Sequence, residues 1–155
     1  MFLKLIKLIE LNKQKFKVGI SVGDPNGIGI EVILKSFQNP EILKLFCPVI
    51  FADVEIIEYQ MEHFNLNLNL NSIKRFEEIC EDSINIFNFS VGDFKHNFGE
   101  STVQGGEVAL KSLLKSADAL KNEKIQALVT GPINKKNILT DTFDFIGHTE
   151  FLSNF

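Results

Sequence analysis

Short apolar runs alternate with helix-like patterns along most of the chain. Runs typical of buried strands occupy residues 17–22, 48–52, 84–89 and 125–130. Residues 65–71 (NLNLNLN) alternate strictly between apolar and polar, which predicts a half-buried or edge strand. Helical patterns occupy residues 28–38, 53–64 and 105–121, and a further short helix is expected from Gly131 to about Leu139. Strands that alternate with helices predict an α/β protein with a largely parallel sheet.

The helix at 105–121 has the strongest pattern. Five apolar residues recur on one helical face: Leu110, Leu113, Leu114, Ala117 and Leu120. Asp53 directly precedes the helix at 53–64, where its carboxylate can cap the free N–H groups of the first turn. Both features favour helices that are packed against a sheet.

Residues 1–16 (MFLKLIKLIELNKQKF) are interpreted as a short amphipathic N-terminal extension that precedes the folded part of the chain at 17–155. Lys4, Lys7 and Glu10 interrupt the apolar runs, and no small-residue cleavage site of a signal peptide follows. Each uncharged run is far shorter than the roughly 20 residues that span a bilayer. We therefore expect no membrane partner.

Composition narrows the class of protein further. The 155 residues are 45% hydrophobic and carry a formal net charge of -4, which suits one globular domain and gives no basic surplus for nucleic acid. Cys47 and Cys80 are the only cysteines and form no CxxC pair. We expect two reduced, buried thiols in a cytoplasmic protein.

The glycine-rich stretch GDPNGIGIE, at residues 23–31, joins the first strand to the first helix. Gly27 and Gly29 supply half of a dinucleotide fingerprint, but its third glycine falls on Val32. Asp24 lies inside the turn, where a carboxylate repels a diphosphate unless it is aimed elsewhere. The alternative is structural: the glycines provide positive φ angles and close contact between strand and helix. A plain NAD-binding Rossmann domain ranks below that interpretation.

Three motifs, in order along the chain, resemble those of the 4-hydroxythreonine-4-phosphate dehydrogenase family. The GDPNGIGIE stretch resembles the G-D-P-x-G-I-G-P-E signature, with Ile30 in place of the usual proline. VTGPINK at 129–135 resembles T-[AG]-P-[IV]-x-K, and GHTEFL at 147–152 resembles G-H-T-E-[FY]-[LF]. The resemblance covers nearly the whole chain but only the N-terminal portion of the family's proteins.

The second motif is also an anion site by its own chemistry. A strand delivers Thr130, Gly131 precedes a proline suited to a first helical position, and Lys135 adds a cation. The alternative is an ordinary strand-to-helix turn with a solvated lysine. Asp24 and Gly27, from the first motif, complete the candidate residues for the cleft or the phosphate.

Histidines fall into two groups. The resemblance implies that His148 and Thr149, in the third motif, contact the phosphorylated substrate. His63 and His96 lie outside the motifs and are expected to be solvated surface residues.

The resemblance further implies a three-layer α/β/α enzyme of two lobes, like isocitrate and isopropylmalate dehydrogenases, that works as a homodimer. Its cofactors are NAD or NADP and a divalent metal (Zn, Mg or Co), whose histidine ligands are expected beyond residue 155. It oxidises 4-phosphooxy-L-threonine to a β-keto acid that decarboxylates to 3-amino-2-oxopropyl phosphate, a step of vitamin B6 biosynthesis.

The chain is therefore expected to be an N-terminal fragment, with the second lobe incomplete and no activity alone. Two alternatives remain open at this point. One is a dehydrogenase of phosphorylated threonate or erythronate, and the other is a non-catalytic module that binds a phosphorylated ligand.

Overall fold

The computed structural model describes residues 15–133. Its centre is a sheet of five strands in the order β3-β4-β2-β1-β5, and every neighbouring pair is parallel. The strands are β1 (Lys17–Ser21), β2 (Cys47–Ala52), β3 (Leu70–Ile73), β4 (Ile84–Asn88) and β5 (Ala127–Thr130). The predicted α/β fold with a largely parallel sheet is confirmed.

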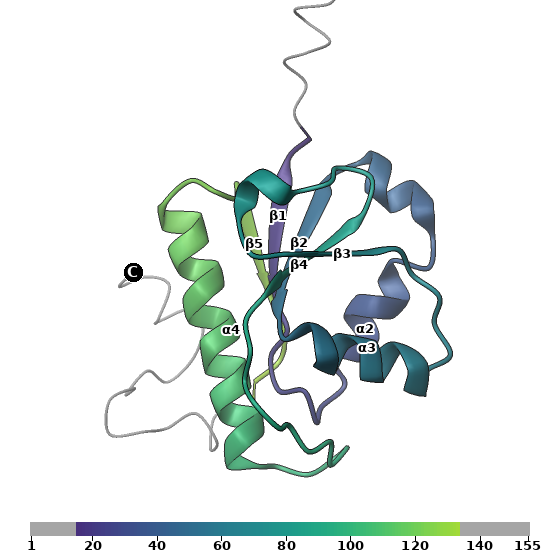
Figure 1. The fold of residues 1–155 in the computed structure, drawn as a ribbon, viewed down its shortest axis with the longest axis vertical. Coiled ribbons are helices and arrows are strands. Elements are labelled where there is room, and N and C mark those ends of the chain that lie inside the picture. The colour runs from purple at the N-terminus through teal and green to yellow at the C-terminus, as the bar shows by residue number, and fades with distance from the viewer. Residues whose placement is uncertain (1–14, 134–155) are drawn as a thin grey trace, which may run out of the picture.

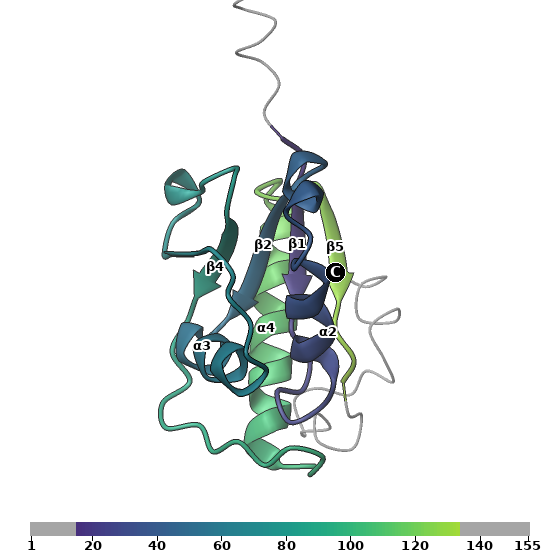
Figure 2. The same cartoon turned by 90° about the vertical axis from the view of Figure 1, so that its right-hand side faces the viewer.

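Helices cover both faces of this sheet. Helices α2 (Gly29–Ser36) and α3 (Val54–His63) lie on one face, and α4 (Val103–Lys121) lies on the other (Figures 1 and 2). Two short 3-10 helices, η1 (Pro40–Lys44) and η2 (Phe76–Glu78), lie in the connections. The arrangement has the three layers that the sequence resemblance implied.

The central strand β2 shows why its sequence is apolar without a break. Ile50 and Ala52 belong to the core shared with α2 and α3, whereas Val49 and Phe51 belong to the core on the side of α4. All six residues of β2 are buried. A strand covered on both faces has no solvent-facing positions, so its polar alternation disappears.

Helix α4 is tied to the sheet by a buried serine as well as by apolar packing. The Ser112 hydroxyl accepts from the Val22 N–H at 3.0 Å and donates to the Phe51 carbonyl at 2.6 Å. The predicted apolar face is confirmed at Leu113 and Ala117, which are buried, but Leu114 is 39% exposed. The helix therefore covers only part of its side of the sheet.

The strand predicted at 65–71 is wrong over most of its length, because β3 begins only at Leu70. Asn65, with a φ of 52°, ends α3, and the Leu66 N–H donates to the Met61 carbonyl. Leu66, Leu68 and Leu70 nevertheless pack against the core. The alternation thus reflects a connecting segment that is buried on one side only. Burial alone does not make such a segment a strand, because it also needs a neighbouring strand for its hydrogen bonds.

One of the two cysteines and the segment after β5 also differ from the expectation. Cys47 is buried as predicted, whereas Cys80 is exposed, because it follows η2 at the margin of the sheet. Burial raises the pKa of the Cys47 thiol, and the Ser83 hydroxyl lowers the pKa of Cys80 by hydrogen bonding to its sulfur. Residues 131–133 are irregular, and the remainder of the helix predicted up to about Leu139 lies outside the described residues.

Candidate functional site

The turns after β1 and β5 meet at the carboxyl edge of the sheet. Ser21 pairs with Thr130 at the ends of these strands, and the Gly131 N–H donates to the Ser21 carbonyl at 2.7 Å. One step further, the Asp24 N–H donates to the Pro132 carbonyl at 3.0 Å. The chain leaves β1 toward β2 on one side, and β5 joins on the other side. Such a switch point is where open α/β sheets bind ligands.

The glycines of the first motif have different structural reasons. Gly23 has a φ of +70°, and a Cβ there would collide with the Pro132 carbonyl oxygen. Gly29 has ordinary dihedral angles, but a Cβ would lie 2.9 Å from the Val22 oxygen. Gly27 needs neither condition, because its closest neighbour would be the Asp24 oxygen at 3.4 Å. The predicted positive φ therefore falls on Gly23 and the close strand-to-helix contact on Gly29.

The Asp24 carboxylate lies close to the first turn of α4. Its carboxylate accepts from the Asn26 N–H at 3.0 Å, and its Oδ1 lies 2.6 Å from where a Cβ on Gly105 would be. Gly105 belongs to the first turn of α4, where the partial positive charge of the helix favours an anion. The side chain is 8% exposed. Asp24 thus lies between the turn after β1 and the start of α4.

Asn26, which the sequence did not single out, connects three segments. Its Nδ2 donates to the Thr102 hydroxyl at 3.0 Å, and its Oδ1 accepts from the Asn97 N–H at 2.9 Å. Its carbonyl accepts from the Gly99 N–H at 2.8 Å. Thr102 in turn caps α4 through the Gly105 N–H. In the sequence, the one indication of this role is an asparagine inside a glycine-rich turn. Such a residue does not indicate hydrogen-bond partners that are distant along the chain.

A cavity of about 440 Å³ opens at this junction. It is lined by Asp24, Asn26, Gly27, Ile28, Gly99, Glu100, Ser101, Pro132 and Ile133. Its lining within residues 15–133 includes two carboxylates but no basic side chain. A phosphate bound here would need a cation from elsewhere, such as the one predicted at Lys135.

The structure therefore brings some of the predicted site residues together. Asp24 and Gly27 line the cavity, and Thr130 and Gly131 support it from the end of β5 without lining it. Lys135, His148 and Thr149 lie outside the described residues, so their roles stay predictions.

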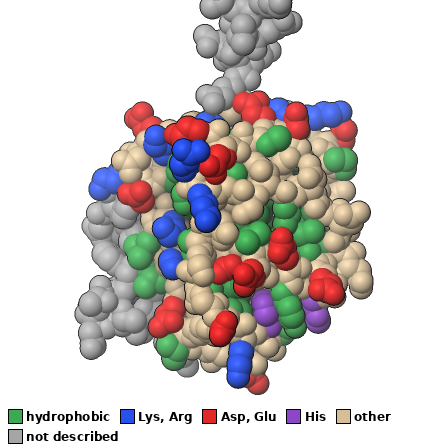
Figure 3. All heavy atoms as spheres, viewed as in Figure 1, with side chains coloured by type: hydrophobic (Ala, Val, Ile, Leu, Met, Phe, Trp, Pro, Cys, Tyr) green, Lys and Arg blue, Asp and Glu red, His purple; other side chains and the backbone are tan. Residues whose placement is uncertain are grey.

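The two remaining histidines form part of a ring cluster beside this site. The rings of His96 and Tyr59 stack at 3.8 Å between centroids, and His63 stacks on Phe98 at 4.7 Å. Figure 3 shows histidine and hydrophobic side chains gathered in this way on the surface. His63 is exposed as predicted, but His96 is partly buried, and its Nδ1 has no hydrogen-bond partner within residues 15–133. The expectation of a solvated surface residue is wrong for His96.

Burial of the His96 imidazole, with a smaller contribution from nearby His63, lowers its pKa. The cluster holds the loop at 94–98 against α3, and the same loop supplies the Asn97 N–H that binds Asn26. The rings thus support the cavity indirectly.

No metal site is formed by the part of the chain that the structure describes. Residues 15–133 contain no group of three or more His, Cys, Asp or Glu side chains placed to hold an ion. None of the helices in this range is long and apolar enough to cross a membrane.

These features define an α/β domain with a parallel sheet and a ligand cavity at its carboxyl edge. Residues 44–155 match the family model of the pyridoxal phosphate biosynthetic protein PdxA, which is more than half of the chain. The chain therefore belongs to this family, and the resemblance inferred from the three motifs is confirmed.

Relatives of known name agree with this assignment. The chain is 30% identical over 142 residues to a 4-hydroxythreonine-4-phosphate dehydrogenase of Bacteroides thetaiotaomicron, covering 92% of the chain and 39% of the relative. It is 33% identical over 141 residues to a protein of Clostridium botulinum named as a putative D-threonate 4-phosphate dehydrogenase, covering 88% of the chain and 42% of that protein. The chain thus spans about two fifths of the length of these relatives.

A crystal structure has the same fold. The 4-hydroxythreonine-4-phosphate dehydrogenase of Burkholderia phymatum superposes with a TM-score of 0.83 at 22% identity, covering 92% of this chain and 44% of that one. At this identity the likeness concerns the fold alone.

Proposed function

We propose that this chain forms part of the substrate cleft of an NAD(P)-dependent dehydrogenase that acts on 4-phosphooxy-L-threonine. The observation that carries the proposal is the junction of two family motifs, where Asp24 N–H binds the Pro132 carbonyl beside a cavity of about 440 Å³. In this reaction the secondary alcohol becomes a ketone, its hydride passes to NAD(P)⁺ and its hydroxyl proton is released. The C–C bond to the carboxylate of the resulting β-keto acid then breaks with loss of CO₂, the enolate that is left takes up a proton, and the product keeps the phosphate.

The divalent metal and much of the nicotinamide site belong, in this proposal, to residues outside 15–133. Carboxylates and glycine turns in the described residues form no metal-ligand set, so they are assigned only to binding and positioning. The Asn26 contacts hold the turn after β1 against the loop at 97–99. We further propose a cytoplasmic homodimer, as the family resemblance implies.

A phosphorylated threonate or erythronate is the second candidate substrate, since the Clostridium relative carries a threonate name. The lining of the cavity favours the amino acid. Glu100 and Asp24 both contribute carboxylates there, and an ammonium group pairs with a carboxylate whereas a hydroxyl only accepts or donates a hydrogen bond. Replacement of Glu100 by Gln is therefore expected to weaken binding of 4-phosphooxy-L-threonine more than binding of threonate phosphate.

The proposal is tested on the 155-residue chain with NAD⁺ or NADP⁺ and Mg²⁺ or Zn²⁺. We expect no reduction of the nicotinamide, together with calorimetric binding of 4-phosphooxy-L-threonine that Glu100→Gln weakens. Turnover by the chain alone would overturn its assignment as part of a cleft. A complete lack of binding at millimolar substrate would overturn the substrate assignment.

A further inference from the structure

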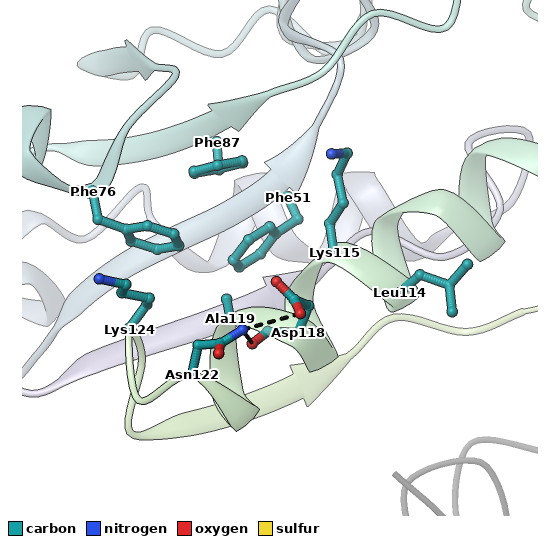
Figure 4. A pocket seen from close by; sticks show the side chains of 9 residues that line it. All are labelled: Phe51, Phe76, Phe87, Leu114, Lys115, Asp118, Ala119, Asn122 and Lys124. Carbon is teal, nitrogen blue, oxygen red and sulfur yellow. Dashed lines mark hydrogen bonds between the residues drawn. The ribbon is translucent and has the colours of Figure 1, made fainter.

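A second hollow, of about 650 Å³, lies on the side of the sheet that carries α4 (Figure 4). Its floor is aromatic and combines Phe51 of β2, Phe87 of β4 and Phe76 of η2. The ring of Phe87 lies 5.3 Å from that of Phe51 and 4.9 Å from that of Phe76. The hollow is separate from the cavity at the carboxyl edge, since the two share no lining residue.

One wall of the hollow is formed by the C-terminal half of α4. Leu114, Lys115, Asp118, Ala119 and Asn122 line it, and Lys124 follows after the end of the helix. The Asn122 amide donates to the Asp118 carbonyl at 2.9 Å and to its carboxylate at 3.0 Å, which fixes this end of the wall (Figure 4).

The hollow exists because the two faces of the sheet are covered unequally. Two helices, α2 and α3, pack side by side on one face, whereas α4 packs against β1, β2 and β5 on the other. Within residues 15–133 no helix covers Phe87 of β4 on this second face, and Leu114 is left 39% exposed. Phe51 is buried, whereas Phe76 and Phe87 are half-buried, so the apolar surface left open consists of these two rings and Leu114. Apolar surface of this kind favours a covering segment.

The chain enters β1 close to this hollow. The Lys15 Nζ binds the Asp82 carboxylate at 2.7 Å and the Glu81 carbonyl at 3.2 Å. The segment that contains these two residues continues directly from η2, which carries Phe76 on the floor of the hollow. Residues that precede Lys15 are therefore joined to the chain next to the segment that leads from the floor of the hollow.

We propose that residues 1–14 of this chain dock in the hollow and cover its aromatic floor. Eight of these 14 residues are apolar: Met1, Phe2, Leu3, Leu5, Ile6, Leu8, Ile9 and Leu11. Leu5, Leu8 and Ile9 have the i, i+3, i+4 spacing of one helical face. Fourteen residues span about 21 Å even in a helix, which is the length of several helical turns along α4. Because the segment is covalently attached nearby, its docking is an intramolecular step with a high effective concentration.

Tryptophan fluorescence tests this proposal, because the chain contains no tryptophan. Phe76→Trp places a single reporter on the floor, and Tyr59→Trp places the matched control on α3, on the opposite face, where the native side chain is 47% exposed. Each reporter is measured in the full chain and in the chain that starts at Lys15. We expect deletion of residues 1–14 to shift the Phe76→Trp emission to longer wavelength and to increase acrylamide quenching several-fold. The control emission is expected to stay unchanged.

Equal quenching of the Phe76→Trp reporter with and without the segment would overturn the proposal. If circular dichroism shows that the shortened chain does not fold, the full chain carrying Leu8→Asn and Ile9→Asn replaces it, with the same expected result. A second copy is the competing occupant. Protection that appears only at concentrations where light scattering finds a dimer would assign the hollow to that copy instead.

Discussion

At the scale of single residues, the junction at the carboxyl edge depends on backbone geometry more than on charge. Gly23 and Gly29 allow the turn after β1 to approach the residues after β5, and Asn26 fastens the same turn to the loop at 97–99. Gly27 lies in the same motif without either steric condition. The junction therefore requires glycine at some positions of the motif and not at others.

Replacement of Gly23 by alanine is expected to destabilise the fold by about 3 kcal/mol, because it adds left-handed backbone strain to a collision with the Pro132 carbonyl. Gly92→Ala is the control. Its φ is +74°, but a Cβ there meets nothing within 4 Å, so a loss of about 1 kcal/mol is expected. Urea unfolding of both variants measures the difference, and equal losses would show that the close approach at Gly23 is not needed.

Asn26→Ala is expected to cost about 2 kcal/mol, since the Asn97 N–H and the Thr102 hydroxyl each lose a partner. Asn122→Ala removes an exposed amide that bonds within α4 and is expected to cost less than about 0.5 kcal/mol. Equilibrium unfolding compares the two variants. A loss at Asn26 no larger than that at Asn122 would contradict the role of Asn26 as a connection between segments.

At the scale of elements, the sequence predicted most of the architecture because strands and helices differ in their apolar period. Buried strands such as β2 and the long helix α4 follow that rule closely. The segment at 65–71 does not, since its alternation records packing on the core without a neighbouring strand until Leu70. Hydrogen-bond partners distant in sequence, such as Asn26 with Asn97, leave no local pattern. The cavity that they hold in place could therefore not be predicted in detail.

The attachment of α4 gives a prediction at this scale. Ser112→Ala leaves both the Val22 N–H and the Phe51 carbonyl without a partner in the core, with an expected loss of about 3 kcal/mol. Ser116 is equally buried, but its hydroxyl bonds only to the Leu113 carbonyl of the same helix, so Ser116→Ala is expected to cost under about 1 kcal/mol. Thermal unfolding followed by circular dichroism ranks the two, and the reverse order would refute the account of how α4 is held.

At the scale of the whole molecule, the described residues form one sheet, and helices cover its two faces unequally. Strand β5 ends the sheet on one side and is only partly buried, with Val129 55% exposed. The relatives are more than twice as long as the stretch that they share with this chain.

The stability of the molecule is expected to depend on pH through His96. Burial lowers its pKa in the folded state below the ordinary value of about 6.5, so the unfolded chain takes up the proton first as pH falls. The contribution of His96 to the free energy of unfolding is therefore complete above pH 6.5. This contribution decreases as the pH falls toward the pKa of His96 in the folded state. His96→Phe keeps a ring beside Tyr59 and is expected to remove this part of the pH dependence. Identical pH profiles of the two proteins between pH 5 and 7 would contradict the prediction.

In the proposed function, the turns after β1 and β5 face a phosphorylated substrate. Nuclear magnetic resonance titration of the isotope-labelled chain with 4-phosphooxy-L-threonine tests it most directly, with inorganic phosphate as the comparison. We predict saturable shifts of the backbone amides that line the cavity, at Asn26, Gly27 and Gly99, and unchanged amides at the hollow beside α4, at Phe76 and Lys124. Shifts confined to the hollow, or no shifts at millimolar substrate, would contradict the account.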